Sequence, residues 1–584
     1  MLRPWDIQSN SQGQFMEKIL KSSTVPALAG AVLAYCMTPW LGFAFDDRKQ
    51  ILANASLLHP SAIPGYFVHA GGYLTGNFSY YRPLFGAWLN LNYFVFGPHP
   101  AGWHVALFLL HLLAVFLCYR LVLTILQDRE VALMAALLFA VHPVHVESVA
   151  WISGGTDPLA AIFVLSAFLF YLNSQTNVKT SILGWLAFAA SLLCKETALL
   201  FPFLILCHSL LLGNDTRRLT TAIKASTPYF LLAAVYLAVR IQVMGGFSHT
   251  STPLSSGTLL LTLPSVALFY VRLLVFPAGL SPFYDTPYVS APSFTGFVFP
   301  VLGLLAIVLL LVWWTRGFPQ PDGPAAKRSR QVIFFAAWTV AFLVPALNLS
   351  ALDAGEIAHD RYLYLPSIGF SALAGIALQQ LGGKLRLSEA ARTAVCGGLG
   401  IILCIATIVQ TGFWKDDLSL YTRGASVAPN NINAQNNLAN IYLETGDFDR
   451  GIAAHQRLLK LNPGHVDSYF NLGLAYYNLG DFARSQPYFQ RAIELRPTAQ
   501  TYFFLGLAQL KTGNLAAAEQ SLQNAVRMDQ GRPDLHAALG VTYESEGKLP
   551  LALQEFETAL TLNPQKVSIR NEITKVKGLL GQPK

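Results

Sequence analysis

Residues 471–497 read NLGLAYYNLGDFARSQPYFQRAIELRP, and residues 504–530 read FLGLAQLKTGNLAAAEQSLQNAVRMDQ. The same pattern recurs in the C-terminal part as pairs of small residues, at Ala439/Gly446, Gly473/Gly480, Gly506/Gly513 and Gly540/Gly547. Prolines recur between the units, at Pro429, Pro463, Pro497 and Pro564. A period of 33–34 residues is typical of tetratricopeptide repeats, in which two helices form each repeat. We therefore expect four repeats over about 430–564 and a capping helix over 565–580.

The rest of the chain has the composition of a membrane protein. Of its 584 residues, 53% are hydrophobic and 12% are charged, whereas soluble domains carry about 25% charged residues. Long apolar runs extend from Thr24 to about Phe413, and the charge density from Trp414 onward is that of a soluble protein. We therefore expect two domains, a transmembrane domain over 1–413 and a repeat domain over 414–584.

Eleven segments are long enough to span a bilayer, which takes about 20 apolar residues. They are 24–43, 103–126, 131–149, 156–172, 180–194, 197–213, 222–242, 294–314, 332–350, 362–382 and 393–413. Segment 258–277 contains Pro264, Arg272 and Pro277, and we expect it to be re-entrant or to lie along the outer surface. The predicted fold class is all-α, a polytopic helical membrane domain followed by an α-solenoid.

Basic residues in the short connectors predict the topology, because positive charge is retained on the cytoplasmic side. The location of Lys and Arg in these connectors accounts for the net charge of +8. We therefore expect the lipid bilayer, and not nucleic acid, as a partner. With a cytoplasmic N-terminus and a retained first span, the loops after Arg316 and Lys384 are cytoplasmic only if segment 258–277 does not cross. The repeats then lie outside the cytoplasm. The six cysteines lack disulfide or zinc spacing, and we expect no structural metal.

Adjacent carboxylates follow the first span at Asp46 and Asp47. Two acids near an apolar boundary raise each other's pKa, which suits a general base, although an ordinary solvated loop has the same pattern. Arg82 follows Tyr80 and Tyr81, and an arginine framed by aromatic rings can hold a phosphate. The alternative is that these rings anchor the chain at the membrane interface.

Further titratable residues cluster at the predicted outer turns. One turn carries His142, His145, Glu147 and Asp157, for which a metal site is a minor alternative. At two other turns, Lys195 precedes Glu196, and Arg361 precedes Tyr362. Lys195 and Glu196 could simply pair with each other, while Arg361 is a second candidate for binding phosphate. Charges at the ends of spans are costly, which favours a function for them.

Five motifs in order give the chain a family resemblance. They are FDD (45–47), YYRPL (80–84), HPVHVESVAWISG (142–154), CKETALLFP (194–202) and DRYLYLPSIG (360–369). Together with the repeats, they resemble the transmembrane and tetratricopeptide-repeat O-mannosyltransferases over nearly the whole chain. Relatives often have a basic residue close to the position of Gly155 and Thr156, and this chain does not.

The resemblance implies a glycosyltransferase of the GT-C type. Such enzymes transfer a sugar from a polyprenyl-phosphate carrier on the outer side of the membrane, without a metal or other cofactor. It implies mannose transfer with inversion to Ser or Thr hydroxyls of an acceptor protein, which the repeats could hold. The resemblance implies catalysis by Asp46 with Asp47 beside it. Because the charge on the leaving lipid phosphate needs cations nearby, we expect Arg361, Arg82 and Lys195, in that order, to bind it. Other outer-face candidates are His142, His145, Glu147, Asp157, Glu196, Tyr81 and Tyr362.

Alternatives stay open from the sequence. The same fold could glycosylate a lipid or a cell-surface glycan, or the chain could be a membrane scaffold whose repeats bind a partner. A transporter is less favoured, because its signs, charges at mid-span and inverted repeats, are not clear here. The expected membrane is the bacterial inner membrane, or the endoplasmic reticulum membrane in a eukaryote.

Overall fold

A computed structural model describes residues 24–69, 80–173, 178–213, 218–246, 254–316, 324–352 and 356–581. Within these ranges the protein is helical and contains no β-strand, which confirms the predicted fold class. The chain divides into two compact units, residues 1–427 and 428–584.

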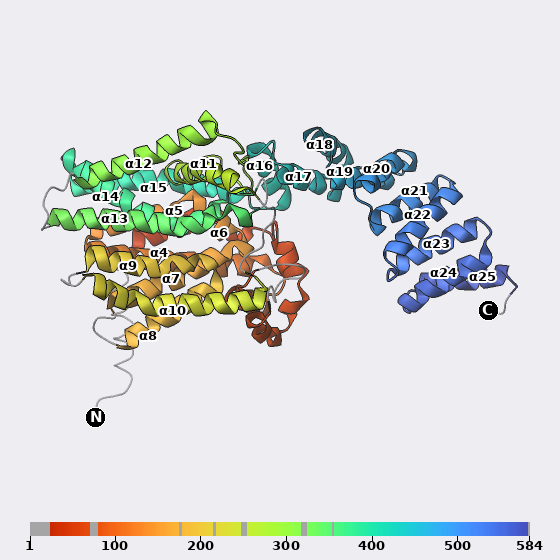
Figure 1. Cartoon of the computed structure of the whole chain (residues 1–584), viewed down its shortest axis with the longest axis horizontal. Helices are drawn as coiled ribbons and strands as arrows, with labels where there is room; N and C mark the ends of the chain where they lie inside the picture. Colours follow the sequence, from red (N-terminus) through yellow and green to blue (C-terminus); the bar gives the residue numbers. More distant parts are fainter. Residues whose placement is uncertain are drawn as a thin grey trace, which may run out of the picture. The chain divides into compact units, whose positions relative to one another are not determined.

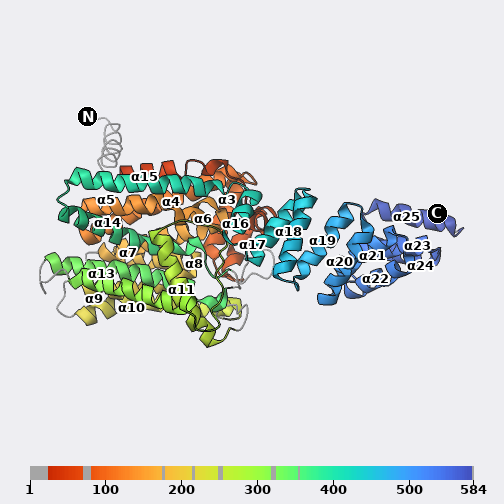
Figure 2. The same ribbon diagram turned by 90° about the horizontal axis from the view of Figure 1, so that it is seen from above.

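Fifteen α-helices between short 3-10 and π turns make up the described part of the first unit. They are α2 (Val25–Ala34), α3 (Pro83–Phe96), α4 (Pro100–Leu126), α5 (Arg129–Val141), α6 (Val146–Ala150), α7 (Thr156–Asn173), α8 (Val178–Cys194), α9 (Phe201–Leu212), α10 (Arg218–Met244), α11 (Ser256–Val275), α12 (Phe299–Arg316), α13 (Pro324–Leu343), α14 (Pro366–Lys384), α15 (Glu389–Gly412) and α16 (Asp417–Val427). Figures 1 and 2 show α4, α5, α13 and α14 running side by side.

The described helices include seven that are long and apolar enough to cross a membrane. They are α4, α7, α10, α11, α12, α13 and α15, each with its adjoining turn where one continues the helix. Helix α5 and the segment Pro143–Ala150, which includes α6, form an eighth if they are one span, with a bend of 50° at the break between them. Predicted spans 24–43, 180–194 and 197–213 correspond to shorter apolar helices, and 362–382 corresponds to α14. Within the described residues, fewer helices than the eleven expected are therefore long and apolar enough to be full-length membrane spans.

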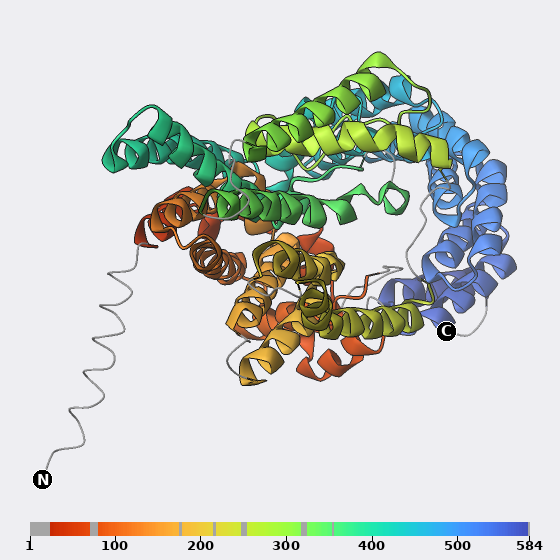
Figure 3. The same ribbon diagram turned by 60° about the vertical axis from the view of Figure 1, so that its left-hand side comes forward.

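Helix α11 covers the segment that we expected to be re-entrant or to lie along the outer surface. It is continuous through Pro264 and long enough to cross, so a re-entrant break is not observed. Its buried side chains, Val266, Tyr270 and Leu273 among them, belong to one cluster with Leu280 and Ile357 of the connecting segments. Figure 1 shows α11 foreshortened beside the horizontal α13, whereas Figure 3 shows it along its length in yellow-green. The position of α11 relative to the membrane stays a prediction.

The second unit consists of helix pairs with one further helix at the end. They are α17 (Ile432–Glu444), α18 (Phe448–Leu461), α19 (Val466–Asn478), α20 (Phe482–Leu495), α21 (Ala499–Lys511), α22 (Leu515–Met528), α23 (Pro533–Ser545), α24 (Leu549–Leu562) and α25 (Val567–Leu579). The predicted spacing of small residues has two physical reasons. A Cβ atom on Gly473 would lie 2.7 Å from the Phe489 ring, so glycine lets α19 approach α20. Gly480 has φ of +79° at the turn between them, which favours glycine.

Helix α25 covers the end of the repeats, as predicted for a cap. Its buried Ile569, Ile573 and Val576 join a cluster with Phe556 of α24. Without α25, the apolar side of α24 would face water.

Candidate active site

The acidic loop after α2 and a short 3-10 turn places two carboxylates in different environments. Asp47 is buried, and its Oδ1 accepts hydrogen bonds from the backbone N–H (2.9 Å) and Oγ (2.6 Å) of Ser153. Burial raises the pKa of Asp47 to about 7, against the lowering effect of these hydrogen bonds. Asp47 therefore joins the loop to the turn after α6 and has little freedom to move.

Asp46 differs from its neighbour because its carboxylate is available. It is half-buried, and within the described residues no hydrogen bond to its side chain is found. Burial raises the pKa of Asp46, while the charges of Lys49 and Arg361 lower it. A half-buried carboxylate with a raised pKa and no fixed partner can accept a proton from a bound hydroxyl.

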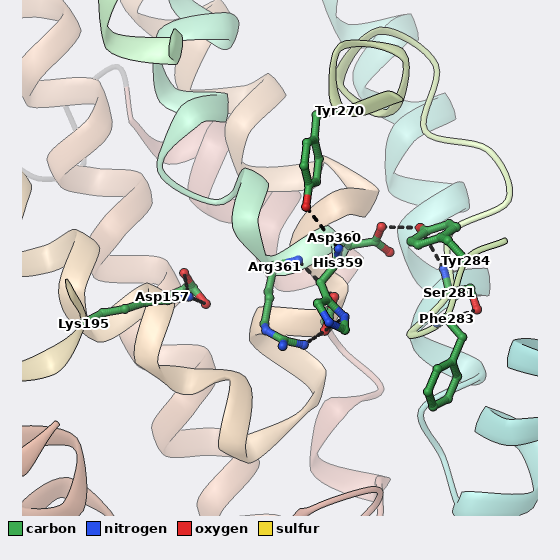
Figure 4. Close-up of polar contacts among 10 residues, drawn as sticks. Asp157, Lys195, Tyr270, Ser281, Phe283, Tyr284, His359, Asp360 and Arg361 are labelled. Carbon is green, nitrogen blue, oxygen red and sulfur yellow. Dashed lines mark hydrogen bonds and ion pairs between the residues drawn. The ribbon is translucent and has the colours of Figure 1, made fainter. Parts of the chain in front are cut away.

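Arg361 lies where α6 meets the turn before α14 (Figure 4). Its guanidinium pairs with the buried carboxylate of Glu147, and its backbone N–H donates to the same group at 3.0 Å. The rings of Trp151 and Tyr362 flank the guanidinium, with centroids 5.3 and 5.2 Å from its central carbon. The structure thus brings together Arg361, Glu147 and Tyr362, which sequence reasoning named separately.

Asp360, next to Arg361, points the other way and forms a second contact in Figure 4. The hydroxyl of Tyr284 donates to its carboxylate, and the Tyr284 oxygen accepts from the backbone N–H of Ser281 at 3.1 Å. Burial, with the charge of Glu147, raises the pKa of Asp360 well above its ordinary value. Sequence reasoning missed Tyr284, because nothing in the 276–293 connector marks one tyrosine as a partner of Asp360.

Lys195 forms a bidentate ion pair with Asp157, shown at the left of Figure 4. The ammonium lies 2.6 and 2.7 Å from the two carboxylate oxygens, and the side chains are 3% and 4% exposed. Burial lowers the pKa of Lys195, and the charge of Asp157 opposes this. The ammonium also lies 5.3 Å from the ring centroid of Tyr362. The alternative in which Lys195 pairs with Glu196 is wrong, because the turn directs the two side chains to different partners.

Glu196 instead pairs with arginines from two other elements. Arg82 binds it through Nε at 3.0 Å and Nη2 at 2.6 Å, and Arg240 lies 3.9 Å away. The ring of Tyr80 stacks 4.6 Å from the Arg82 guanidinium. Tyr81 has a separate role, because its hydroxyl donates to the carbonyl of Phe67 at 3.0 Å.

Arg240 was not singled out from the sequence. It lies within a predicted span, 222–242, where an arginine near the end indicates only an interfacial charge. The structure buries it against Tyr236, whose hydroxyl accepts from Nη1 at 3.2 Å. Among the described residues, four cations therefore gather at this site: Lys195, Arg82, Arg240 and Arg361.

His142 and His145 are packed inside the protein. His142 Nε2 contacts the carbonyl of Leu274 at 3.0 Å, and His145 Nε2 contacts Ser367 Oγ at 2.8 Å. Within the described residues, no group of three His, Cys, Asp or Glu side chains could hold a metal ion. These two histidines therefore support the fold around the site.

A small recess lies beside the Lys195–Asp157 pair. The residues that line it are Asp157, Thr197, Phe342, Ala346, Tyr362 and Leu365. The hydroxyl of Thr197 is buried there and has no hydrogen-bond partner in the described structure. Its lining therefore combines two polar side chains, Asp157 and Thr197, with apolar and aromatic ones.

Comparisons with known proteins agree with the resemblance drawn from the motifs. Protein O-mannosyl-transferase F38B6.6 of Caenorhabditis elegans is 27% identical over 69% of this chain and 57% of its own length. Tmtc1 of Drosophila melanogaster is 26% identical over 71% of this chain and 59% of its own length. Human TMTC4 is 26% identical over 74% of this chain and 66% of its own length. All three are named protein O-mannosyl-transferases.

The family resemblance is therefore confirmed, and the chain spans a little over half the length of the first two relatives. Two family models described as tetratricopeptide repeat match residues 438–504 and 503–567, which confirms the repeats. Among solved structures, a crystal structure of MamA protein is 24% identical over 26% of this chain and 82% of its own, with a TM-score of 0.25. A thermophilic TPR protein of Thermus thermophilus is 23% identical over 30% of this chain and 95% of its own, with a TM-score of 0.24.

Proposed function

We propose that this chain transfers mannose from a polyprenyl-phosphate carrier to Ser or Thr hydroxyls of proteins, with Asp46 as general base and inversion at the sugar. The observation that carries the proposal is the free, half-buried carboxylate of Asp46 at the edge of a cluster of four cations. The three relatives described above are protein O-mannosyl-transferases, which supports the reaction class.

The reaction is a single displacement. The acceptor oxygen forms a bond to the anomeric carbon as the bond from that carbon to the phosphate oxygen breaks. The hydroxyl proton passes to Asp46, and the electron pair of the broken bond stays on the lipid phosphate. Because the nucleophile enters opposite to the leaving group, the product has the inverted configuration. The two charges that develop, on the acceptor oxygen and on the phosphate, therefore require a base on one side of the sugar and cations on the other.

The cation cluster supplies the second requirement. Arg361 contacts Glu147 through Nη1, and a guanidinium carries five N–H donors, so further donors can face a phosphate. Lys195 and Arg82 lie on the turn and loop beside it, each held by a carboxylate. Cations that are fixed before the reaction stabilise a developing charge without reorganising, which is the larger part of such catalysis in many enzymes. We rank Arg361 first, because the charge of this residue also acts on Asp46.

The two carboxylates beside each other have different tasks. Asp47 is fully engaged with Ser153, so it holds the loop and is not free to take a proton from a substrate. We therefore propose a structural role for Asp47, in place of the catalytic role beside Asp46 that the resemblance implies. The carboxylates Asp157, Glu147 and Glu196 are each paired with a cation and are poor alternatives as bases.

The repeats extend the proposal to the acceptor. Helical repeats of this kind present an extended inner surface that suits an unfolded segment. A protein acceptor would be held there while its hydroxyl enters the site. In this proposal the repeats lie on the same side of the membrane as Asp46.

The test is transfer by the purified full chain in lipid nanodiscs, with synthetic polyprenyl-phosphate mannose and a Ser/Thr-rich acceptor peptide. We expect mass spectrometry to show a hexose on the peptide, and NMR to show an anomeric configuration opposite to that of the donor. Transfer from a nucleotide sugar alone, or a product with the donor's configuration, would refute the proposed donor class or the proposed mechanism.

A further inference from the structure

Asp417 is a buried acid that no motif marks and that the proposed reaction does not yet use. It is the first residue of α16, and its side chain is 7% exposed. Its Oδ1 accepts a hydrogen bond from the backbone N–H of Phe45 at 2.7 Å. Its Oδ2 lies 2.8 Å from Nε of Arg48. One carboxylate therefore contacts the acidic loop on both sides of Asp46 and Asp47.

The contact meets the loop where its backbone is strained. Phe45 has φ of +58°, a left-handed conformation that costs free energy for any residue with a Cβ. Such conformations persist only where surrounding contacts fix them, and they concentrate at functional sites. Phe45 directly precedes Asp46, so the φ angle of Phe45 determines the direction in which the Asp46 side chain points from the loop.

Aromatic packing holds the Phe45 ring but cannot hold its amide. The ring lies against Trp151, Phe283 and Tyr421, with centroids 5.4, 5.9 and 6.2 Å away. These contacts fix the side chain, whereas rotation about φ moves the backbone N–H. In the described structure, the backbone N–H of Phe45 donates its hydrogen bond to the carboxylate of Asp417. Because the acceptor is charged, this hydrogen bond is strong.

We propose that Asp417 is a positioning residue for the reaction, because its carboxylate holds Phe45 in the left-handed conformation that presents Asp46 to the acceptor. The inference rests on the proposed function for its kinetic part, while its structural part stands on the contacts alone. Asp417 touches neither donor nor acceptor in this account. Its removal should therefore lower the rate of the chemical step without weakening donor binding.

The neighbouring residue provides a matched control. Asp416 has the same side chain, but its Oδ1 caps α16 by accepting from the backbone N–H of Ser419 at 2.8 Å. It makes no described contact with the acidic loop. Asp416→Ala therefore removes a capping contact of α16 and leaves the hydrogen bond to Phe45 in place. If Asp417 acted only by stabilising α16, the two alanine variants would behave alike.

The experiment compares Asp417→Ala, Asp417→Asn and Asp416→Ala in the full chain in nanodiscs. For Asp417→Ala we expect kcat to fall about 10- to 100-fold, the worth of a hydrogen bond to a charged group, with the donor KM within about twofold. Asp417→Asn keeps an acceptor for Phe45 and should recover most of the rate, because the Arg48 side chain is 59% exposed and its ion pair is weak. Asp416→Ala should have nearly the rate of the unmodified chain.

A second measurement does not depend on catalysis. Hydrogen–deuterium exchange of the peptide covering residues 44–50 should rise in Asp417→Ala and stay unchanged in Asp416→Ala. If the unmodified chain shows no transfer but the exchange changes as expected, the proposed function fails and the positioning contact stands. Unchanged exchange together with unchanged kcat in Asp417→Ala overturns the proposal, and so does an equal loss of kcat in Asp416→Ala.

Should Asp417→Ala fail to fold, Asp417→Glu gives the same contrast. It keeps the charge but moves the acceptor by one methylene group, so its kcat should fall below that of Asp417→Asn. A kcat for Asp417→Glu equal to that of the unmodified chain, with Asp417→Asn impaired, would mean that charge alone matters and would overturn the proposal.

Discussion

The buried pair of Lys195 and Asp157 gives the sharpest prediction for stability. Asp157→Asn keeps the shape of the side chain but leaves the ammonium without a counter-charge. Both side chains are almost fully buried, so solvent screening gives little relief. Removing one partner of a buried ion pair costs about 3–5 kcal/mol. Lys195 can also become neutral by losing its proton, which at pH 7 costs at most about 5 kcal/mol. The cost of breaking the ion pair and the cost of deprotonation therefore agree.

The sign of the pH dependence follows from the pKa of Lys195. Burial lowers this pKa below its unfolded value, and Asp157 raises it. The unfolded state of the variant therefore binds more protons than the folded state, so the stability of Asp157→Asn increases as pH rises toward the unfolded pKa of about 10. The deficit relative to the unmodified chain should therefore be smaller at pH 9.5 than at pH 7.

Thermal unfolding of the detergent-solubilised full chain measures this directly. At about 2 °C or less per kcal/mol for a unit of this size, Tm should fall by several degrees at pH 7. The double variant Lys195→Met/Asp157→Leu is the control, because replacing both charges with apolar groups is often close to neutral. If Asp157→Asn changes Tm by less than about 1 °C, the view that the two charges are coupled and shielded from water is refuted. A double variant with a lower Tm than Asp157→Asn would refute it as well.

Three further predictions concern other parts of the chain. Arg361→Ala should raise the donor KM as well as lower kcat, since the cation holds the phosphate in both the ground and the transition state, which steady-state kinetics would show. Asp47 has a folded pKa of about 7, above its unfolded value, so stability should fall as pH rises from about 4 to about 7, and Asp47→Asn should remove that slope in thermal melts. Residues 428–584 should express as a soluble fragment with a helical circular dichroism spectrum, and aggregation despite the α25 cap would contradict this.

Much of the fold could be predicted because its signals are local. The tetratricopeptide period depends on contacts between adjacent helices, such as Gly473 against Phe489, so a short stretch of sequence contains it. Apolar runs likewise show where the membrane helices lie. Their ends are less predictable, because α2 stops at Ala34 where a 3-10 turn follows, although the apolar run continues to Phe43.

The candidate site could be predicted as a set of residues but not as a set of contacts. Lys195 adjoins Glu196 in sequence, yet it pairs with Asp157, because helix packing decides which side chains meet. Asp417 is farther still in sequence from the loop that it contacts, and the sequence shows it only as one of two adjacent acids at the start of a helix. Tertiary contacts of this kind leave no local pattern.

The central claim is that Asp46 removes the acceptor proton, and Asp46→Asn tests it most directly. Asparagine is nearly isosteric but cannot accept a proton at neutral pH. General-base catalysis contributes about 10²- to 10⁴-fold, so single-turnover transfer from polyprenyl-phosphate mannose should slow by that factor, with donor affinity nearly unchanged. A folded Asp46→Asn protein that transfers mannose at the rate of the unmodified chain would contradict the account and place the base elsewhere.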